Sequence, residues 1–334
     1  MIEAIERGGY LPQTIGFWVN PSLYDKKGED RVQSLKNDYP VDVTMLIPTF
    51  PGYEGSPLED HPSYVWGGSV QSSSSAALDA RQLIADWAEL DAFIENMPEA
   101  TFPPLMQAAA QTAKEDLTGR YRLCHFWYFL YERLWSFRGM ENALCDLLMN
   151  RGEVDRLLGT LCDFYIGVID RTQREIGCEG VYVTDDLGTQ QSLMFSPETF
   201  REVFLPHYRR VIDFCHQKKL HFWLHSCGNI ESILPDLIDS GVDVLHPIQK
   251  FAMDEAEIAK KYAGKICFMC GMDVQDAMPF GTPEDVRKEV KRLVQTFKAN
   301  NGRMIFSLGN GTTPDIPVEN LCALYDEVYK LRNY

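Results

Sequence analysis

Residues 220–229 read Leu220-His-Phe-Trp-Leu-His-Ser-Cys-Gly-Asn229. Apolar and aromatic residues dominate the first half of this stretch, and small polar residues end it. This pattern predicts a buried strand that stops near Ser226. Helix-type spacing of apolar residues precedes the stretch, from Pro197 to Lys218, and follows it, from Ile230 to Ile238. A buried strand between two amphipathic helices is typical of a parallel sheet covered by helices.

The same alternation extends over most of the 334 residues. Eight strands are predicted: Thr14–Val19, Val41–Ile47, Tyr121–Phe129, Gly180–Thr184, the stretch that begins at Leu220, Val242–His246, Lys265–Cys270 and Arg303–Leu308. Eight such units predict an α/β fold of the (β/α)8 TIM-barrel type. We expect a single domain over residues 1–334 with N-terminal additions, and a small hairpin on the rim around residues 64–80. No GxGxxG or GxxxxGK[ST] motif follows a predicted strand, which argues against a doubly wound nucleotide-binding fold.

Composition narrows the classes of function. Lys and Arg number 32 against 48 Asp and Glu, so the net charge is -16. Such a chain repels nucleic acid and anionic membranes, and it is a poor match for a polycarboxylate substrate. No apolar run approaches the roughly 18 residues that span a bilayer, and the first residues lack the apolar core of a signal peptide. The nine cysteines are odd in number and scattered, which fits reduced thiols in the cytoplasm.

Side chains two residues apart on a strand share a face, so His225 and Cys227 are expected to point the same way. The active sites of barrels lie at the carboxyl ends of the strands, where both residues are found. An imidazole and a thiolate that converge there are two of the three protein ligands that a catalytic zinc needs. Cys270, at the end of another strand, is the best-placed third ligand. The alternative is that His225 and Cys227 are both core residues, because free cysteine is among the most buried residue types.

Other strand ends supply candidates for the remaining roles. Asp186 and Asp273 could act as general acid or base, although an aspartate at a strand end also commonly caps the following turn. If the strand continues through Asp185 and Asp186, their side chains point in opposite directions and one of them is structural. Four residues near strand ends are predicted to contact the substrate: Trp18, Asp185, Gln249 and Asn310.

Five stretches together resemble the uroporphyrinogen decarboxylase superfamily. The resemblance runs from about Trp66 to the C-terminus. The stretches are Leu134-Trp-Ser-Phe-Arg-Gly-Met-Glu141, Asp185–Gln190 with Ser196–Arg201, Leu224–Asn229, Phe280–Glu284 and Pro314–Asn320. The resemblance implies the (β/α)8 barrel that the strand count also predicts.

This superfamily contains porphyrinogen decarboxylases and zinc-dependent methyltransferases that work with corrinoid proteins. The decarboxylases carry an arginine-rich N-terminal stretch that grips substrate carboxylates, whereas Arg7 is the only arginine here before Tyr24. His225 and Cys227 match the zinc motif of the methyltransferases. Where known members have a third cysteine ligand in the final-strand loop, this chain has Asn310, so Cys270, Asp185 or Asp186 would have to replace it.

The resemblance therefore implies a zinc-dependent methyltransferase that moves a methyl group between a small substrate and a corrinoid held by a partner protein. Demethylation of a methoxylated compound is the preferred version, and a thiol methyl acceptor is the second. Two alternatives stay open: a cofactor-independent decarboxylase or lyase that uses Asp186 or Asp273, and a non-catalytic barrel that binds a small molecule or a corrinoid protein. The oligomeric state, a homodimer included, is not determined by the sequence.

Overall fold

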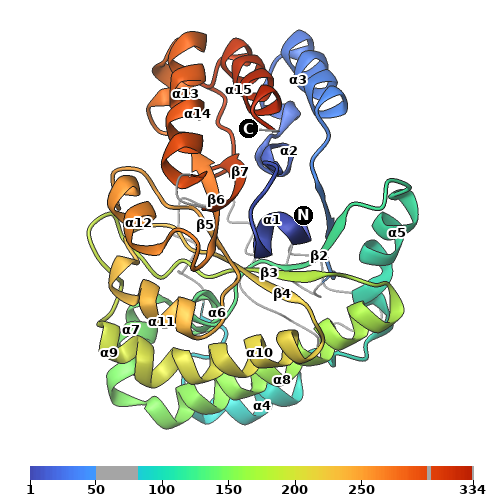
Figure 1. The fold of residues 1–334 in the computed structure, drawn as a ribbon. Helices are drawn as coiled ribbons and strands as arrows, with labels where there is room; N and C mark the ends of the chain where they lie inside the picture. Colours follow the sequence, from blue (N-terminus) through green and yellow to red (C-terminus); the bar gives the residue numbers. More distant parts are fainter. Residues whose placement is uncertain (50–81, 299–301, 333–334) are drawn as a thin grey trace.

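The structure is a computed structural model that describes residues 1–49, 82–298 and 302–332 (Figure 1). Its centre is one parallel sheet of seven strands in the order of the sequence. The strands are β1 Val43–Leu46, β2 Tyr121–Phe126, β3 Gly180–Thr184, β4 His221–His225, β5 Val244–His246, β6 Cys267–Met272 and β7 Arg303–Leu308. The predicted TIM-type α/β fold is confirmed, and the predicted rim hairpin at 64–80 lies outside the described residues.

Helices connect and cover the strands. The α-helices are α1 Ile2–Glu6, α2 Ile15–Trp18, α3 Lys26–Asp38, α4 Leu90–Glu95, α5 Gln107–Glu115, α6 Tyr131–Arg138, α7 Met140–Met149, α8 Arg151–Glu175, α9 Pro197–Thr199, α10 Leu205–Gln217, α11 Leu234–Asp239, α12 Glu255–Tyr262, α13 Ala277–Phe280, α14 Pro283–Lys298 and α15 Val318–Lys330. Short 3-10 turns are η1 Pro21–Leu23, η2 Trp87–Glu89, η3 Pro103–Met106 and η5 Glu231–Ile233, and η4 Phe200–Phe204 is a π-helical turn. None of the described helices combines the length and apolar character that crossing a bilayer requires.

One of the eight predicted strands is wrong. The segment Thr14–Val19 contains helix α2, because Ile15, Trp18 and Val19 have the spacing of one helix face and all three are buried there. The extended chain just before it still closes the barrel. Phe306 of β7 hydrogen bonds to residues 12 and 14, and the backbone N–H of Asp42, next to β1, donates to the carbonyl of Gln13. Seven strands and this short segment therefore surround the barrel interior.

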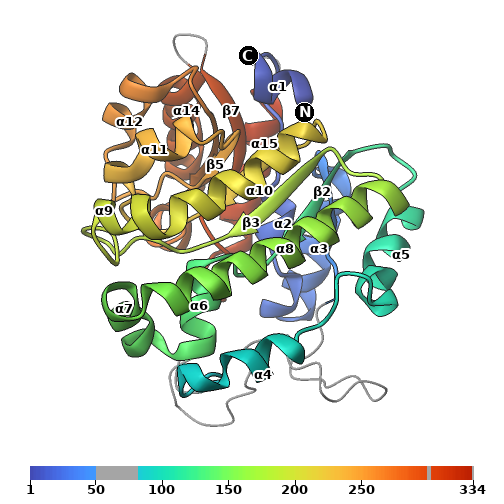
Figure 2. The ribbon, with the colours of Figure 1, turned by 90° about the horizontal axis from the view of Figure 1, so that it is seen from below.

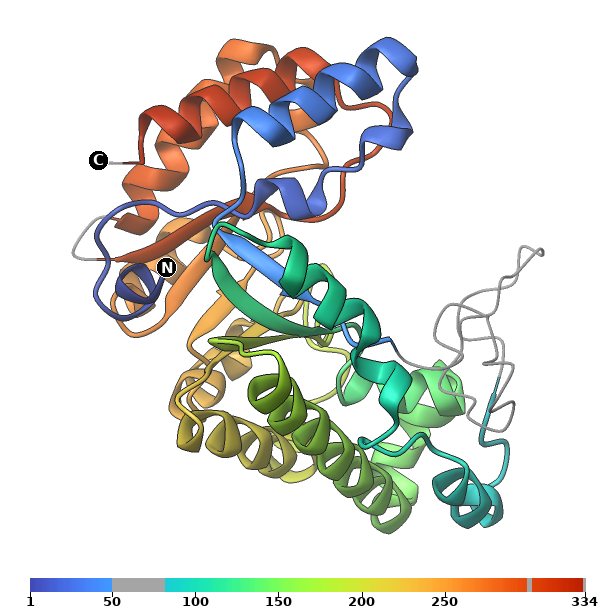
Figure 3. The same cartoon turned by 90° about the vertical axis from the view of Figure 1, so that its right-hand side faces the viewer.

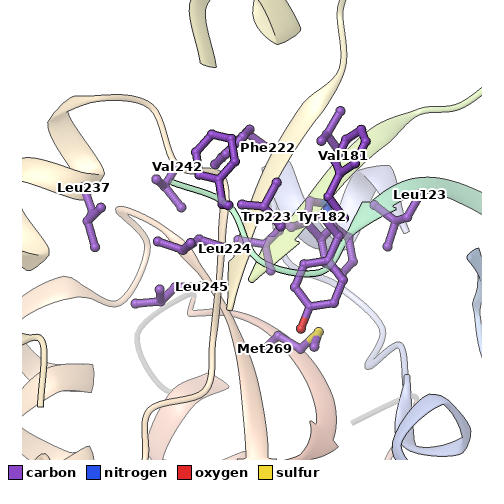
Figure 4. Close-up of a cluster of buried hydrophobic side chains, with 14 of the residues drawn as sticks. Leu123, Val181, Tyr182, Phe222, Trp223, Leu224, Leu237, Val242, Leu245 and Met269 are labelled. Carbon is purple, nitrogen blue, oxygen red and sulfur yellow. The ribbon is translucent and has the colours of Figure 1, made fainter. Parts of the chain in front are cut away.

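Side chains fill the barrel interior. Tyr182 of β3 is in register with Trp223 of β4, both are fully buried, and their ring centroids lie 6.1 Å apart. Figure 4 shows these two rings beside each other, with Met269 of β6 near the Tyr182 hydroxyl. Because packed side chains occupy the barrel interior, a substrate pocket is expected at the ends of the strands.

The outer layer consists of helices that run against the sheet. Helices α8 and α10 lie side by side outside β3 and β4 (Figures 1 and 2). On the other side of the barrel, α15 lies between α3 and α14 (Figure 3). The π-turn η4 lies immediately before α10, next to Pro206, which has no N–H to continue the helical ladder.

Candidate functional site

Three side chains from two neighbouring strand ends meet at the mouth of the barrel. Asp186 follows β3, His225 is the last residue of β4, and Cys227 lies two residues further on. The Nε2 atom of His225 lies 3.3 Å from the Sγ atom of Cys227 and 3.5 Å from Oδ1 of Asp186. The three potential ligand atoms all lie within 4.8 Å of one another. The predicted convergence of His225 and Cys227 is present, with Asp186 beside them.

The geometry of this group fits a divalent metal ion. Zinc bonds of about 2.0–2.3 Å in a tetrahedral arrangement place neighbouring ligand atoms about 3.3–3.8 Å apart. The two distances from His225 fall in that range. One carboxylate, one imidazole and one sulfur are also donor types that zinc accepts together. Among the described residues, this is the one His, Cys, Asp and Glu cluster with metal-binding geometry.

Backbone hydrogen bonds hold the two loops in place. The N–H of Cys227 donates to Oδ1 of Asp186 at 2.7 Å, and the N–H of Gly228 donates to Oε1 of Gln249 at 2.6 Å. Gly228 has a φ angle of +83°, a conformation that L side chains rarely adopt. Gln249, which was predicted to contact the substrate, thus fixes the loop that carries Cys227.

Burial controls the protonation of the three groups. Burial raises the pKa of the Cys227 thiol, and the nearby carboxylates of Asp186 and Glu132 raise it further. Burial also lowers the pKa of the His225 imidazole, while Asp186 opposes this shift. At neutral pH and without a cation, this site therefore holds a thiol beside a neutral imidazole. A bound divalent cation would displace the thiol proton.

Glu132 was missed by the sequence analysis. It lies on α6 and not at a strand end, its side chain is buried, and Oε2 accepts a hydrogen bond of 3.0 Å from the Thr184 hydroxyl. Burial raises the pKa of this carboxyl well above its usual range, and Asp186 and Asp185 add to the shift. The sequence signal that could have pointed to it is its position two residues before Leu134–Glu141, a stretch that carries the family resemblance.

Asp185 faces away from the cluster formed by Asp186, His225 and Cys227. Its carboxylate accepts hydrogen bonds from the backbone N–H groups of residues 130–132 and from the hydroxyl of Tyr208. It is fully buried, and burial raises its pKa to about 6 against the lowering effect of these hydrogen bonds. Asp185 therefore anchors the start of α6, which corrects the expectation that it contacts the substrate.

Cys270 does not reach the cluster either. Met269 faces the barrel interior, where its sulfur lies 3.5 Å from the Thr14 hydroxyl. Because side chains alternate along β6, Cys270 faces outward, and Glu255 and Arg292 are the charged groups near it. It is 1% exposed, and burial raises its pKa. Cys270 was expected to supply the third ligand, but it lies outside the cluster. Asp186 is the third residue beside His225 and Cys227.

A pocket of about 410 Å3 opens beside Asp186 and Cys227. Four amide side chains line it, together with apolar groups and two further charged residues: Gln190, Gln249, Gln275, Asn310, Met194, Pro247, Val274, Lys250 and Asp273. The amide nitrogen of Asn310 lies 3.7 Å from Sγ of Cys227. Predicted contacts Gln249 and Asn310 therefore border the pocket.

The two charges on the far side of the pocket are already engaged. The carboxylate of Asp273 accepts hydrogen bonds from the backbone N–H groups of residues 275, 276 and 277, so it holds the segment that leads into α13. The ammonium of Lys250 lies 2.8 Å from Oε1 of Glu289. Asp186 is therefore the better placed of the two aspartates that were expected to act in catalysis.

Trp18 forms a wall of the site and not a lining of the pocket. It is 7% exposed, and its ring centroid lies 5.4 Å from that of His225 and 5.0 Å from that of His246. This places helix α2, in the position where a strand was expected, directly over two histidines at the barrel mouth.

Comparisons with known proteins show what the chain is similar to. The family profile "Uroporphyrinogen decarboxylase (URO-D)" matches residues 83–331. A uroporphyrinogen decarboxylase of Xanthomonas euvesicatoria pv. vesicatoria (strain 85-10) is 26% identical over 183 residues, which are 52% of this chain and 49% of that protein. A methylated-thiol–coenzyme M methyltransferase of Methanosarcina mazei is 27% identical over 188 residues, 55% of this chain and 47% of that protein. The chain spans about half the length of the curated relatives it matches.

A solved structure described as a methyltransferase from Methanosarcina mazei shares the fold. Its TM-score is 0.64 at 13% sequence identity, and the match covers 98% of this chain and 96% of the other. The shared fold therefore extends beyond the residues that the family profile matches.

Proposed function

Because this chain belongs to the uroporphyrinogen decarboxylase family, we propose that it is the methyltransferase type of member and not a porphyrinogen decarboxylase. It would move a methyl group between a small methylated substrate and a corrinoid carried by a partner protein, and zinc would be its metal. The observation that carries the proposal is the cluster of Asp186, His225 and Cys227 beside an open pocket. The resemblance of part of the chain to a curated methyltransferase supports the same reading.

Asp186, His225 and Cys227 would hold the metal. When bound, the metal supplies Lewis acidity that makes an ether oxygen a better leaving group, or that stabilises a thiol acceptor as thiolate. Demethylation of a methoxylated compound is the preferred version. In that version the ether C–O bond would break as the methyl group bonds to the reduced corrinoid of the partner, and the released oxygen would take up one proton.

The protein supplies position and environment for this transfer. The loop bonds from Cys227 to Asp186 and from Gly228 to Gln249 fix the ligand atoms before a substrate arrives. Met194, Pro247 and Val274 give the pocket apolar walls, while the amide side chains can orient a polar substituent. Asn310 stands against the sulfur of Cys227 and can contact a substrate atom that approaches it.

Pocket charge argues against a porphyrinogen substrate. Several substrate carboxylates would need cationic partners, and arginine is the residue best suited to bind them. Of the described residues that line the pocket, none is an arginine, and Lys250 is already paired with Glu289. Lysine and arginine are also outnumbered across the chain, which has a net charge of -16. The pocket therefore favours an uncharged methyl donor.

The test combines metal content with methyl transfer. Purified protein is analysed for bound metal and then incubated with uncharged methoxylated compounds and reduced cobalamin, whose spectrum changes on methylation. We expect about one zinc per chain and metal-dependent methylation. Cys227→Ala should lose both, whereas Cys270→Ala, a matched removal of a buried thiol outside the cluster, should retain both.

The two alternatives give different results in the same experiment. A decarboxylase or lyase would turn over a carboxylated substrate without metal or corrinoid. A binding barrel would show ligand affinity without any turnover. Full methyl transfer by metal-free protein, or equal effects of the two cysteine variants, would overturn the proposal.

A further inference from the structure

His225 touches a second buried histidine on the side that faces away from Cys227. His225 of β4 and His246 of β5 are register partners on neighbouring parallel strands, so their side chains lie on the same face of the sheet. Their Nδ1 atoms are 2.7 Å apart. Both residues are buried, with 5% and 0% of their surface exposed. This short contact restricts where the protons on both rings can be.

The carbonyl of Leu308 determines which ring nitrogen of His246 carries the proton. Nε2 of His246 lies 2.7 Å from the backbone oxygen of Leu308, and a carbonyl oxygen can only accept a hydrogen bond. The Nε2 atom of His246 must therefore carry a proton. Because His246 is a neutral imidazole in this buried position, its Nδ1 atom has a free lone pair and acts as an acceptor.

The protonation of His246 in turn determines which ring nitrogen of His225 carries the proton. Two lone pairs cannot face each other across 2.7 Å without a proton between them, so the proton in this contact belongs to Nδ1 of His225. A neutral His225 that carries its proton on Nδ1 has its lone pair on Nε2. That atom faces Cys227 at 3.3 Å and Asp186 at 3.5 Å.

Surrounding groups keep this arrangement in place. The indole ring of Trp18 covers both imidazoles, stacked on His246 and tilted over His225. The hydroxyl of Tyr182 also lies 3.2 Å from Nδ1 of His246, where it can donate a second, longer hydrogen bond. Both rings are buried, and the hydrogen-bond partners of their nitrogen atoms are protein groups.

We propose that His246 is a positioning residue which, held by the carbonyl of Leu308, fixes His225 as the Nδ1–H tautomer and so aims the Nε2 lone pair at the site formed with Asp186 and Cys227. A metal-binding imidazole needs this lone pair, and the partner of its other nitrogen sets its availability and basicity. The proposal concerns the protein's own tautomer, and its consequence for a metal rests on the proposed function.

The direct test is the protonation pattern of His225 in metal-free protein. Long-range proton–nitrogen NMR spectra of histidine-labelled protein distinguish protonated from unprotonated ring nitrogens, and His225→Gln assigns the signals. We expect Nε2 of His225 to be unprotonated in the wild type. A protonated Nε2 in the metal-free wild type would overturn the proposal, whether or not the protein binds metal or transfers methyl groups.

Three variants test the role of His246. His246→Phe removes the acceptor, His246→Asn keeps an acceptor oxygen near the Nδ1 position, and Tyr182→Phe is the matched control that removes only the longer bond to His246. We expect His246→Phe to shift the tautomer and to weaken Co2+ and Zn2+ binding about 10- to 100-fold. The Asn variant should recover part of the loss, and the Tyr182 variant should stay within about threefold of wild type.

Equal tautomer ratios and equal metal affinities in His246→Phe and Tyr182→Phe would contradict the proposal. If His246→Phe does not fold, the wild-type spectrum and the Asn variant still decide it. The expected tautomer in a protein that binds no metal would support the positioning by His246 and refute the proposed metal function instead.

Discussion

Gly188 and Gly228 lie against each other so closely that a Cβ atom on Gly228 would overlap the backbone of Gly188. Gly188 follows β3 and Gly228 follows β4, so their contact joins the two loops that carry Asp186 and Cys227. The conformation of Gly228, with φ at +83°, adds a second reason for glycine at this position.

Gly228→Ala should separate the two loops and weaken metal binding by tenfold or more. The overlap and the strained φ should also lower the free energy of unfolding by about 1–3 kcal/mol. Gly152→Ala is a suitable control, because an added Cβ there meets nothing within 4 Å. Calorimetric zinc titration and denaturant unfolding of both variants measure the two effects. Wild-type metal affinity in Gly228→Ala would show that the loop contact is unimportant.

Metal binding should release about one proton. The pKa of Cys227 is raised by burial and by nearby carboxylates, so the unliganded sulfur is a thiol at neutral pH. A metal must displace this proton, and apparent affinity should therefore rise about tenfold per pH unit below the thiol pKa. Zinc titrations in buffers of different ionisation enthalpy count the released protons. Release that is identical in Cys227→Ala would assign the proton to another group.

Freeing Lys250 should change the preferred substrate charge. Glu289 neutralises Lys250 at the pocket edge, and Arg292 contacts the same carboxylate. Glu289→Gln should therefore strengthen the binding of carboxylated methoxy compounds by about 3- to 10-fold. The affinity for uncharged analogues should change little. Lys250→Gln is the control in which no such gain is expected. Competition binding with matched charged and uncharged compounds measures the difference, and an equal gain for both classes would refute this explanation.

Asp185, which anchors the start of α6, should affect the free energy of unfolding and not the metal affinity. Asp185 accepts three backbone N–H groups and the Tyr208 hydroxyl in a fully buried position. Asp185→Ala leaves these donors without their acceptor and should lower the free energy of unfolding by about 2–4 kcal/mol. Tyr208→Phe removes one of the four bonds and should cost about 1 kcal/mol. Thermal unfolding of the two variants checks the order of these effects.

The sequence predicted what depends on strand alternation. His225 and Cys227 converge because one ends β4 and the other follows two residues later. Alternation could not choose between Asp185 and Asp186, since β3 ends at Thr184 and both residues lie beyond it. Cys270 was placed wrongly because β6 continues to Met272, so Cys270 lies within the strand on its outer face.

The N-terminal segment shows a second limit of sequence patterns. Ile15, Trp18 and Val19 are spaced in a way that fits a helical face, but the surrounding apolar residues also fit a short strand. Long-range hydrogen bonds from residues 12–14 to Phe306 and Asp42 close the barrel just before this helix, and no local pattern encodes them. His246, next to a proline, likewise became informative only when its contacts with His225 and Leu308 were known.

X-ray absorption spectroscopy of the zinc-loaded protein tests the central claim most directly, because it counts sulfur ligands separately from nitrogen and oxygen. The cluster of Asp186, His225 and Cys227 predicts one sulfur, with nitrogen or oxygen at every other position. That sulfur signal should vanish in Cys227→Ala and persist in Cys270→Ala. Two sulfur ligands, or a sulfur signal that survives in Cys227→Ala, would contradict this account.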